Sequence, residues 1–205
     1  MMPLKKKLTS NMQMEQKNIF NKKPMVLVFA GPNGSGKSTI TEFFETIGTY
    51  TNADDIVAAT GISNIKAAQQ VDEKRYLSIN KKEDFTFETV LSSNYKIDIL
   101  KKARDSGYFI KCIFVLTIDP MINIARVEAR VANGGHNVDS ETIKKRYYKS
   151  LANIKELIKL CDILHVYDNS TDKPVRIIRK HKNQFSIFPN KLWTKEKIFA
   201  LLEAE

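Results

Sequence analysis

The sequence has only two cysteines and no long apolar segment. Cys112 and Cys161 show no spacing used by metal or redox sites, and each lies in an apolar stretch, so we expect buried thiols rather than a disulfide. No stretch approaches the ~20 apolar residues that a membrane span requires. The basic start, MMPLKKKLTS, is not followed by the apolar run of a signal peptide. These absences predict a cytoplasmic protein with no membrane partner.

The length and composition predict one globular domain with a basic extension. The chain has 205 residues, of which 42% are hydrophobic and 27% charged, and it contains no internal repeat. The net charge of +10 favours an anionic partner, such as nucleic acid, a membrane surface or a phosphorylated ligand. Residues 1–23 carry six lysines against one acidic residue. We therefore expect a flexible extension over residues 1–23 and a single domain over residues 24–205.

Apolar runs rich in branched side chains alternate along the chain with segments of helical periodicity. This alternation predicts an α/β fold with a mostly parallel central sheet flanked by helices. We expect strands near residues 25–30, 49–52, 85–89, 109–117, 163–167, 175–179 and 184–188. We expect helices at 37–47, in a region broken near 61–63, and at 96–106, 121–132, 141–160 and from 194.

The segment GPNGSGKST at residues 31–39 follows a predicted buried strand and opens a predicted helix. It fits the phosphate-loop pattern G-x-x-x-x-G-K-[ST], in which glycines turn backbone N–H groups toward phosphate oxygens. Lys37 can reach the β- and γ-phosphates, and the Ser38 hydroxyl can bind Mg²⁺. The predicted nucleotide-binding residues are Gly31, Pro32, Asn33, Gly34, Ser35, Gly36, Lys37, Ser38 and Thr39.

Other motifs narrow the class of phosphate-loop protein. The base-reading motif N-K-x-D is missing, which disfavours a GTPase. An apolar run ending in Asp-Glu, common in motor ATPases, is also missing. The short chain therefore favours a kinase that uses ATP or GTP with Mg²⁺. A phosphate-loop switch without a catalytic role remains the alternative.

Four carboxylates follow predicted strands. Asp54 and Asp55 come after the second strand, Glu88 lies near the end of the third, and Asp119 follows the fourth. Ligands of parallel α/β sheets bind outside the carboxyl ends of the strands, so these side chains are expected near the phosphate loop. A kinase needs a carboxylate beside the acceptor hydroxyl. Each carboxylate is alternatively a solvated loop charge, and Asp54 alternatively caps a helix.

Three arginines flank the Asn-Gly-Gly-His break at residues 133–136. Arg126 and Arg130 are four residues apart and share a helix face, and Arg146 lies on the next predicted helix. Two helices joined by a glycine hinge predict a helical lid at about residues 126–146, which closes over the phosphates. The alternative is an ordinary basic helix surface.

Taken together and in their order along the chain, several motifs resemble those of the zeta-toxin family of phosphate-loop kinases. The resemblance is closest to the compact, stand-alone branch of that family. The resemblance runs from about residue 25 to 170. Its motifs are GPNGSGKST at 31–39, NADDI at 52–56, FTFETVLSS at 85–93, DP at 119–120, RVEARVANGGHNV at 126–138, RYYKSL at 146–151 and VYDNS at 166–170.

The resemblance implies a function. Several family members are toxins that phosphorylate the 3′-hydroxyl of UDP-N-acetylglucosamine, and in several systems a small antitoxin protein blocks the nucleotide site. By matching motifs, Asp54 would be the catalytic base, and Glu88 with Thr89 would open the acceptor-binding stretch. Arg126 or Arg130, together with Arg146, would be lid arginines. Nucleic acid is not an expected partner on this reading.

Two departures from the family pattern fall where the acceptor should bind. Residues 90–93 lack the arginine of the longer family members, and residues 67–70 lack the Gly-Lys/Arg pattern of compact members. These departures bear on the acceptor rather than on the chemistry. A kinase of another small metabolite or of a nucleic-acid end therefore remains an alternative to a nucleotide-sugar kinase.

Overall fold

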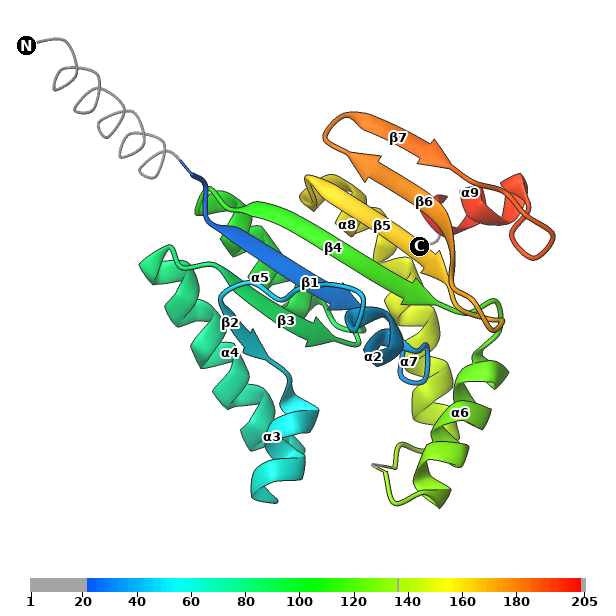
Figure 1. Ribbon diagram of the computed structural model, residues 1–205, viewed down its shortest axis with the longest axis horizontal. Helices are drawn as coiled ribbons and strands as arrows, with labels where there is room; N and C mark the ends of the chain where they lie inside the picture. The colour runs from blue at the N-terminus through cyan, green and yellow to red at the C-terminus, as the bar shows by residue number, and fades with distance from the viewer. Residues whose placement is uncertain (1–21, 136, 204–205) are drawn as a thin grey trace, which may run out of the picture.

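The computed structural model describes residues 22–135 and 137–203. Most of the expected extension over residues 1–23 lies outside this part of the chain, as does His136 in the expected lid. The described residues form one sheet with most of the helices packed on one of its faces (Figure 1).

A seven-stranded sheet forms the centre, with strand order β2-β3-β1-β4-β5-β6-β7. The first five strands in this order pair in parallel, and β6 and β7 add to one edge as an antiparallel hairpin. This arrangement confirms the predicted α/β fold with a mostly parallel sheet. The strands are β1 (Met25–Ala30), β2 (Thr49–Thr51), β3 (Phe85–Thr89), β4 (Phe109–Leu116), β5 (Ile163–Asp168), β6 (Val175–His181) and β7 (Gln184–Ile187).

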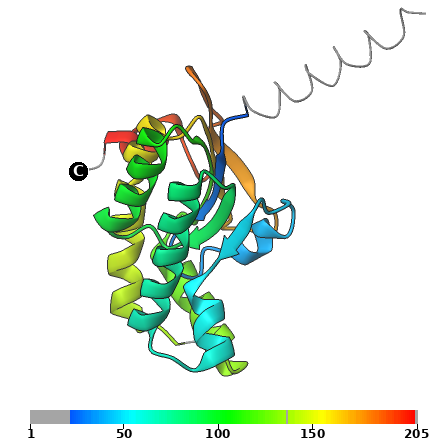
Figure 2. The ribbon, with the colours of Figure 1, turned by 90° about the vertical axis from the view of Figure 1, so that its left-hand side faces the viewer.

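Helices cover the two faces of the sheet unequally (Figure 2). One face packs against a large layer of helices and forms the main core, whereas α2 alone packs on the other face, over β1 and β4. The helices are α2 (Lys37–Thr41), α3 (Ala53–Thr60), α4 (Asn64–Lys81), α5 (Asn94–Asp105), α6 (Pro120–Ala132), α7 (Ser140–Ala152), α8 (Ile154–Leu160) and α9 (Lys195–Glu203).

Two predicted helices are shorter than expected. The helix predicted over residues 37–47 ends at Thr41, because the following N–H groups bond three residues back and tighten the chain into turns. The helix predicted over residues 141–160 is two helices, α7 and α8, that meet at Asn153. The Asn153 side chain donates to the carbonyl oxygen of Leu91, which fixes this break against the core.

The two cysteines are free and buried, as predicted. Burial raises the pKa of the Cys112 thiol well above its usual value, so the thiol stays protonated. Within residues 22–135 and 137–203, every helix is too short or too polar to cross a bilayer.

Candidate active site

The phosphate loop joins β1 to α2, at the carboxyl end of a strand in the middle of the sheet. Gly31, Gly34 and Gly36 have φ angles of 144°, 74° and 85°, which side-chain-bearing residues rarely adopt. A Cβ atom on Gly31 would lie 2.0 Å from the carbonyl oxygen of Val115. The loop therefore needs glycine both for its conformation and for its close packing on the neighbouring strand.

Lys37 lies in the first turn of α2, with its ammonium group folded over the loop. Its Nζ donates to the carbonyl oxygens of Gly31 at 3.0 Å and Pro32 at 3.1 Å, and it lies 3.9 Å from Glu88 Oε1. Burial lowers the pKa of Lys37, while the charges of Glu88 and Asp54 raise it. The site therefore places one buried cation between the loop and two carboxylates.

Glu88 ends β3, beside β1 in the sheet. Burial raises the pKa of Glu88, the charge of Lys37 opposes this shift, and Asp54 and Asp55 reinforce it. The Tyr50 hydroxyl donates to Glu88 Oε2 at 3.4 Å. The carboxylate is thus held between Lys37 and Tyr50 rather than left in solvent.

Asp54 lies in the first turn of α3 and is exposed. The cap of this helix is Asn52, whose Oδ1 accepts from the backbone N–H of Asp54 at 3.1 Å. The side chain of Asn52 also donates to Asp55 Oδ1 at 3.1 Å. The capping role considered for Asp54 therefore belongs to Asn52, which leaves the Asp54 carboxylate directed at the site.

The three arginines face the phosphate loop from the two helices α6 and α7. Arg146 Nη1 donates to Asn33 Oδ1 at 3.4 Å, which links α7 to the loop. Nη1 of Arg126 is buried and has no partner among the described residues, and the same holds for the Ser35 hydroxyl. Buried polar atoms are normally paired, so these two point to a ligand at the loop.

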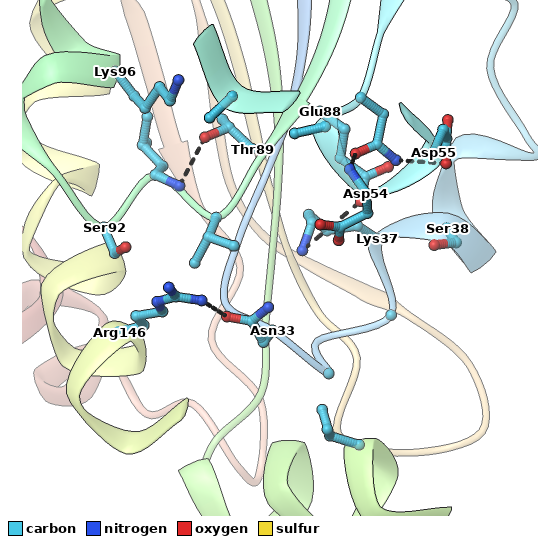
Figure 3. A pocket seen from close by; sticks show the side chains of 18 of the residues that line it. Asn33, Lys37, Ser38, Asp54, Asp55, Glu88, Thr89, Ser92, Lys96 and Arg146 are labelled. Atoms are coloured by element: carbon cyan, nitrogen blue, oxygen red, sulfur yellow. Dashed lines mark hydrogen bonds and ion pairs between the residues drawn. The ribbon is translucent and has the colours of Figure 1, made fainter. Parts of the chain in front are cut away.

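One cavity of about 690 Å³ joins these groups. Figure 3 shows Lys37, Asp54 and Glu88 together on one side, with Arg146 and Asn33 across the cavity. Gly31, Pro32 and Ser35 are buried within the loop instead. The predicted site residues that line the cavity are Asn33, Gly34, Gly36, Lys37, Ser38, Thr39, Asp54, Glu88, Thr89, Arg126, Arg130 and Arg146.

Asp119 is the predicted carboxylate that does not line the cavity. Its Oδ1 accepts from the backbone N–H of Met121 at 2.7 Å, and it caps the N-terminus of α6. Asp119 therefore stabilises the start of the helix that carries Arg126 and Arg130. Replacing such a cap costs ~1 kcal/mol.

A buried charge network behind the cavity was not predicted. Arg75 on α4 donates to Thr51 Oγ1 at 2.9 Å, to Asp72 Oδ1 at 2.9 Å and to two backbone oxygens, those of Thr51 and Glu88. Its guanidinium lies 4.5 Å from the ring centre of Phe87. Arg75 thereby ties β2 to β3, the strands that lead to Asp54 and Glu88.

Lys96 on α5 completes this network and lines the cavity (Figure 3). Its Nζ lies 2.7 Å from both oxygens of Asp72, and burial lowers its pKa. Lys96 and Arg75 carry two positive charges against the one carboxylate of Asp72. Neither lies in a recognisable motif of the sequence, although both sit in segments that were predicted to be helical.

Two asparagines hold the phosphate loop from neighbouring elements. Asn169, after β5, donates to the carbonyl oxygen of Ser35 at 2.9 Å, and Asn123 on α6 donates to that of Asn33 at 2.6 Å. Asn169 lies within the VYDNS segment already noted, although its role was not foreseen. These contacts keep the loop carbonyls away from the cavity.

The donor set at the loop fits Mg²⁺. The Ser38 hydroxyl is exposed at the cavity, near the carboxylates of Asp54 and Asp55. Oxygen ligands of this kind are those that Mg²⁺ prefers, usually one or two from the protein with the rest from phosphate and water. Residues 22–135 and 137–203 contain no group of three or more His, Cys, Asp or Glu side chains suited to a metal.

Comparison with known proteins gives one sequence relative and a clear fold. No protein-family profile matches the chain. An uncharacterized protein of Haemophilus influenzae is 28% identical over 141 residues, covering 65% of this chain and 100% of that protein.

Among solved structures, chains of the AvrRxo1-ORF1:AvrRxo1-ORF2 complex with sulphate ions and with ATP match with TM-scores of 0.66 and 0.64 at 12% identity. They cover 90% and 91% of this chain, which spans 65% of their length. A chain of the PezAT toxin-antitoxin system of Streptococcus pneumoniae matches with a TM-score of 0.55 and 15% identity, covering 76% of this chain and 71% of that one. At these identities the likeness shows the fold alone, and it agrees with the mostly parallel α/β sheet described above.

Proposed function

We propose that the protein is a zeta-toxin-like kinase that transfers the γ-phosphate of ATP or GTP to a sugar hydroxyl. The first candidate acceptor is the 3′-hydroxyl of UDP-N-acetylglucosamine or a related nucleotide sugar. One observation carries the proposal: Lys37, Asp54, Glu88 and three arginines come from five elements to line one cavity. A switch that only binds nucleotide has no use for paired carboxylates beside the phosphate loop.

The roles follow from the positions. The loop N–H groups and Lys37 would hold the β- and γ-phosphates, and Ser38 would supply a hydroxyl to Mg²⁺, whose charge offsets that of the phosphates. Asp54, exposed at the cavity and not used as a cap, would accept the proton of the acceptor hydroxyl. Glu88 and Thr89 would bind the acceptor beside it.

The arginines would act on the transferred group. Arg126, Arg130 and Arg146 line the cavity from α6 and α7, opposite the carboxylates. These cations would stabilise the charge that develops on the phosphoryl group during transfer. This electrostatic stabilisation is largest in a closed, water-poor site. The two helices would then serve as the lid, with the Gly134–Gly135 turn between them.

The acceptor would lie at the end of the cavity formed by β3, α4 and α5. That end is lined by Val71, Ser92, Ser93 and Lys96, which combine an apolar surface, two hydroxyls and one cation. Such a lining suits a polar, negatively charged molecule, as a nucleotide sugar is. The missing arginine at residues 90–93 is thus compensated in charge by Lys96.

A small antitoxin is the proposed protein partner. The solved structures of similar fold include complexes described as AvrRxo1-ORF1:AvrRxo1-ORF2 and as a toxin-antitoxin system. A protein that covered the nucleotide cavity of this chain would silence it by excluding ATP. Co-purification of the protein with the product of a neighbouring reading frame, and loss of ATP binding in that complex, would test this partner.

The test of the activity is phosphoryl transfer to a defined acceptor. The purified protein is incubated with MgATP or MgGTP and a panel of UDP-sugars, and each acceptor is examined for the mass gain of one phosphate. Lys37→Ala is expected to abolish the gain, whereas Lys66→Ala, at an exposed site on α4, is expected to leave it unchanged. ADP release that does not depend on any acceptor would instead support the nucleotide switch. Transfer to 5′-hydroxyl oligonucleotides but not to UDP-sugars would support a nucleic-acid-end kinase.

A further inference from the structure

One half of the sheet leaves a face without helices. The helices that cover β5, β6 and β7 pack on the face that forms the main core, while α2 covers the opposite face over β1 and β4, with the half-buried Tyr167 of β5 at the margin of that cover. Figure 1 looks onto this open face, and Figure 2 shows the same strands at the edge of the helical layer. β6 and β7 form an antiparallel hairpin, which commonly leaves one face to solvent, so the side chains on this face decide whether it has a use.

The strand register brings positive side chains together on this face. His165 pairs with Arg179, and Tyr167 pairs with Arg176, in the β5–β6 ladder. Lys111 lies two residues before Ile113, the partner of His165 in the β4–β5 ladder, and so shares the same face. His181 lies two residues after Arg179 on this face. We call the set Lys111, His165, Arg176, Arg179 and His181 the basic sheet face.

The basic sheet face has no counter-charge from its own strands. The remaining described residues that the register places on this face of β4–β7 carry no carboxylate: Ile113, Val115, Ile163, Tyr167, Gln184 and Ser186. Burial lowers the pKa of His165 to about 4, and four neighbouring positive groups, Arg176, Lys111, Arg179 and His181, contribute in that order. The histidine is therefore neutral near pH 7.

Two buried nitrogen atoms on this face are left without partners. Nδ1 of His165 and Nε of Arg176 form no hydrogen bond within the described residues. Such atoms are rare in folded proteins and each calls for a partner that is missing. Nε of Arg176 is a donor with a positive charge, so an acceptor-rich, negatively charged ligand would satisfy it.

Aromatic rings alternate with the cations. Arg176 lies 5.1 Å from the ring centre of Phe188, which is 38% exposed, and the Tyr167 ring lies 6.2 Å from that of His165. Lys111 lies 5.5 Å from the ring centre of Phe44. Flat rings and guanidinium groups between cations on an open sheet are what unpaired bases stack on, while the cations follow the phosphates. An acidic peptide would use the cations alone.

We propose that the basic sheet face binds single-stranded nucleic acid, with Lys111, Arg176 and Arg179 on phosphates and Tyr167 and Phe188 against bases. This surface is separate from the nucleotide cavity and does not depend on which acceptor the enzyme phosphorylates. Its residues come from three strands and form no motif along the chain. It gathers three of the chain's positive charges, those of Lys111, Arg176 and Arg179, on one face of the fold.

The proposal is tested by measuring affinity for oligouridine and oligothymidine strands of about 12 nucleotides. Fluorescence anisotropy gives these affinities at several salt concentrations. We expect the full chain to bind, and the variant Lys111→Gln/Arg176→Gln/Arg179→Gln to bind roughly tenfold or more weakly. Losing three phosphate contacts should flatten the slope of log affinity against log salt by about 2, at ~0.7 per contact. The control Lys74→Gln/Lys81→Gln/Lys102→Gln removes the same charge from exposed positions on α4 and α5 and should bind nearly as well as the wild type.

A second pair of variants separates nucleic acid from an acidic protein. Tyr167→Leu/Phe188→Leu keeps every charge but removes two rings, and should weaken oligonucleotide binding by roughly fivefold or more. Three outcomes would each overturn the proposal. The wild type fails to bind, or the control variant loses as much affinity as the triple variant. The third is that the ring variant keeps its affinity and polyglutamate competes fully. If the triple variant melts early, the exposed Arg179→Gln alone replaces it. Stronger binding of one of the two strands would identify RNA or DNA as the natural class.

Discussion

The side-chain amide of Asn169 donates a 2.9 Å hydrogen bond to the carbonyl oxygen of Ser35, joining the end of β5 to the phosphate loop across 134 residues of sequence. The same amide nitrogen lies 2.1 Å from where a Cβ on Gly36 would stand. One side chain therefore both holds the loop and fills the space that the glycine leaves. The loop's shape depends on a contact that its own motif does not contain.

Asn169→Ala is expected to weaken MgATP binding by about tenfold, since it leaves a buried carbonyl oxygen without its donor, at a cost of roughly 1–3 kcal/mol. Isothermal titration with a non-hydrolysable ATP analogue measures the affinity. Asn80→Ala, at an exposed position of α4, serves as the control. Equal affinities for the three proteins would show that the loop holds its shape without this contact.

Replacing Asn52 should change the stability of the fold, whereas replacing Asp54 should change the rate of phosphoryl transfer. Asn52→Ala removes the cap of α3 and the hydrogen bond to Asp55, and is expected to lower the free energy of unfolding by ~1 kcal/mol. Asp54→Asn should keep stability and ATP affinity but reduce acceptor phosphorylation by roughly a hundredfold or more. Urea unfolding and single-turnover transfer measure the two effects. A normal transfer rate in Asp54→Asn would direct the search for the base to Glu88.

Gly135→Ala tests the placement of Arg130. An added Cβ would lie 2.6 Å from Arg130 Cγ and 3.0 Å from the Arg130 carbonyl oxygen, so the arginine must move. We expect a fall in kcat close to that of Arg130→Ala, with a much smaller change in ATP affinity, because the charge it meets develops during transfer. Steady-state kinetics on both variants provide the comparison. A normal kcat in both variants would show that Arg130 is an ordinary residue of the helix surface.

His165 should make stability depend on pH in the acid range. Its pKa is lowered from 6.5 to about 4 in the folded protein, so the unfolded chain binds the extra proton first as the pH falls. The contribution of His165 is present above pH 6.5 and is lost progressively as the pH falls toward 4. His165→Gln should therefore flatten the melting temperature between pH 6.5 and 4, whereas His181→Gln, at an exposed site, should not. Identical pH profiles for wild type and His165→Gln would contradict this assignment.

Much of the fold could be predicted because its signals are local. β1 and β3 are short apolar or alternating runs, and the phosphate loop carries its glycines at fixed spacing, so strand, turn and helix start are all encoded within a few residues. The break between α7 and α8 was missed because the apolar period continues through it. At the point where the first helix ends, Asn153 bonds to Leu91, 62 residues away, a contact that local periodicity does not reveal.

The sequence by itself determined the phosphate loop, the parallel sheet and the carboxylates and arginines that line the cavity, because each of these follows from residue type and spacing along the chain. Tertiary structure alone decided that Asn52 caps α3 while Asp54 faces the cavity, and that Arg75, Lys96 and Asn169 belong to the site. It also decided that cations from three strands share one open face. These features depend on strand order and register, which bring distant residues together and leave no mark in any single segment.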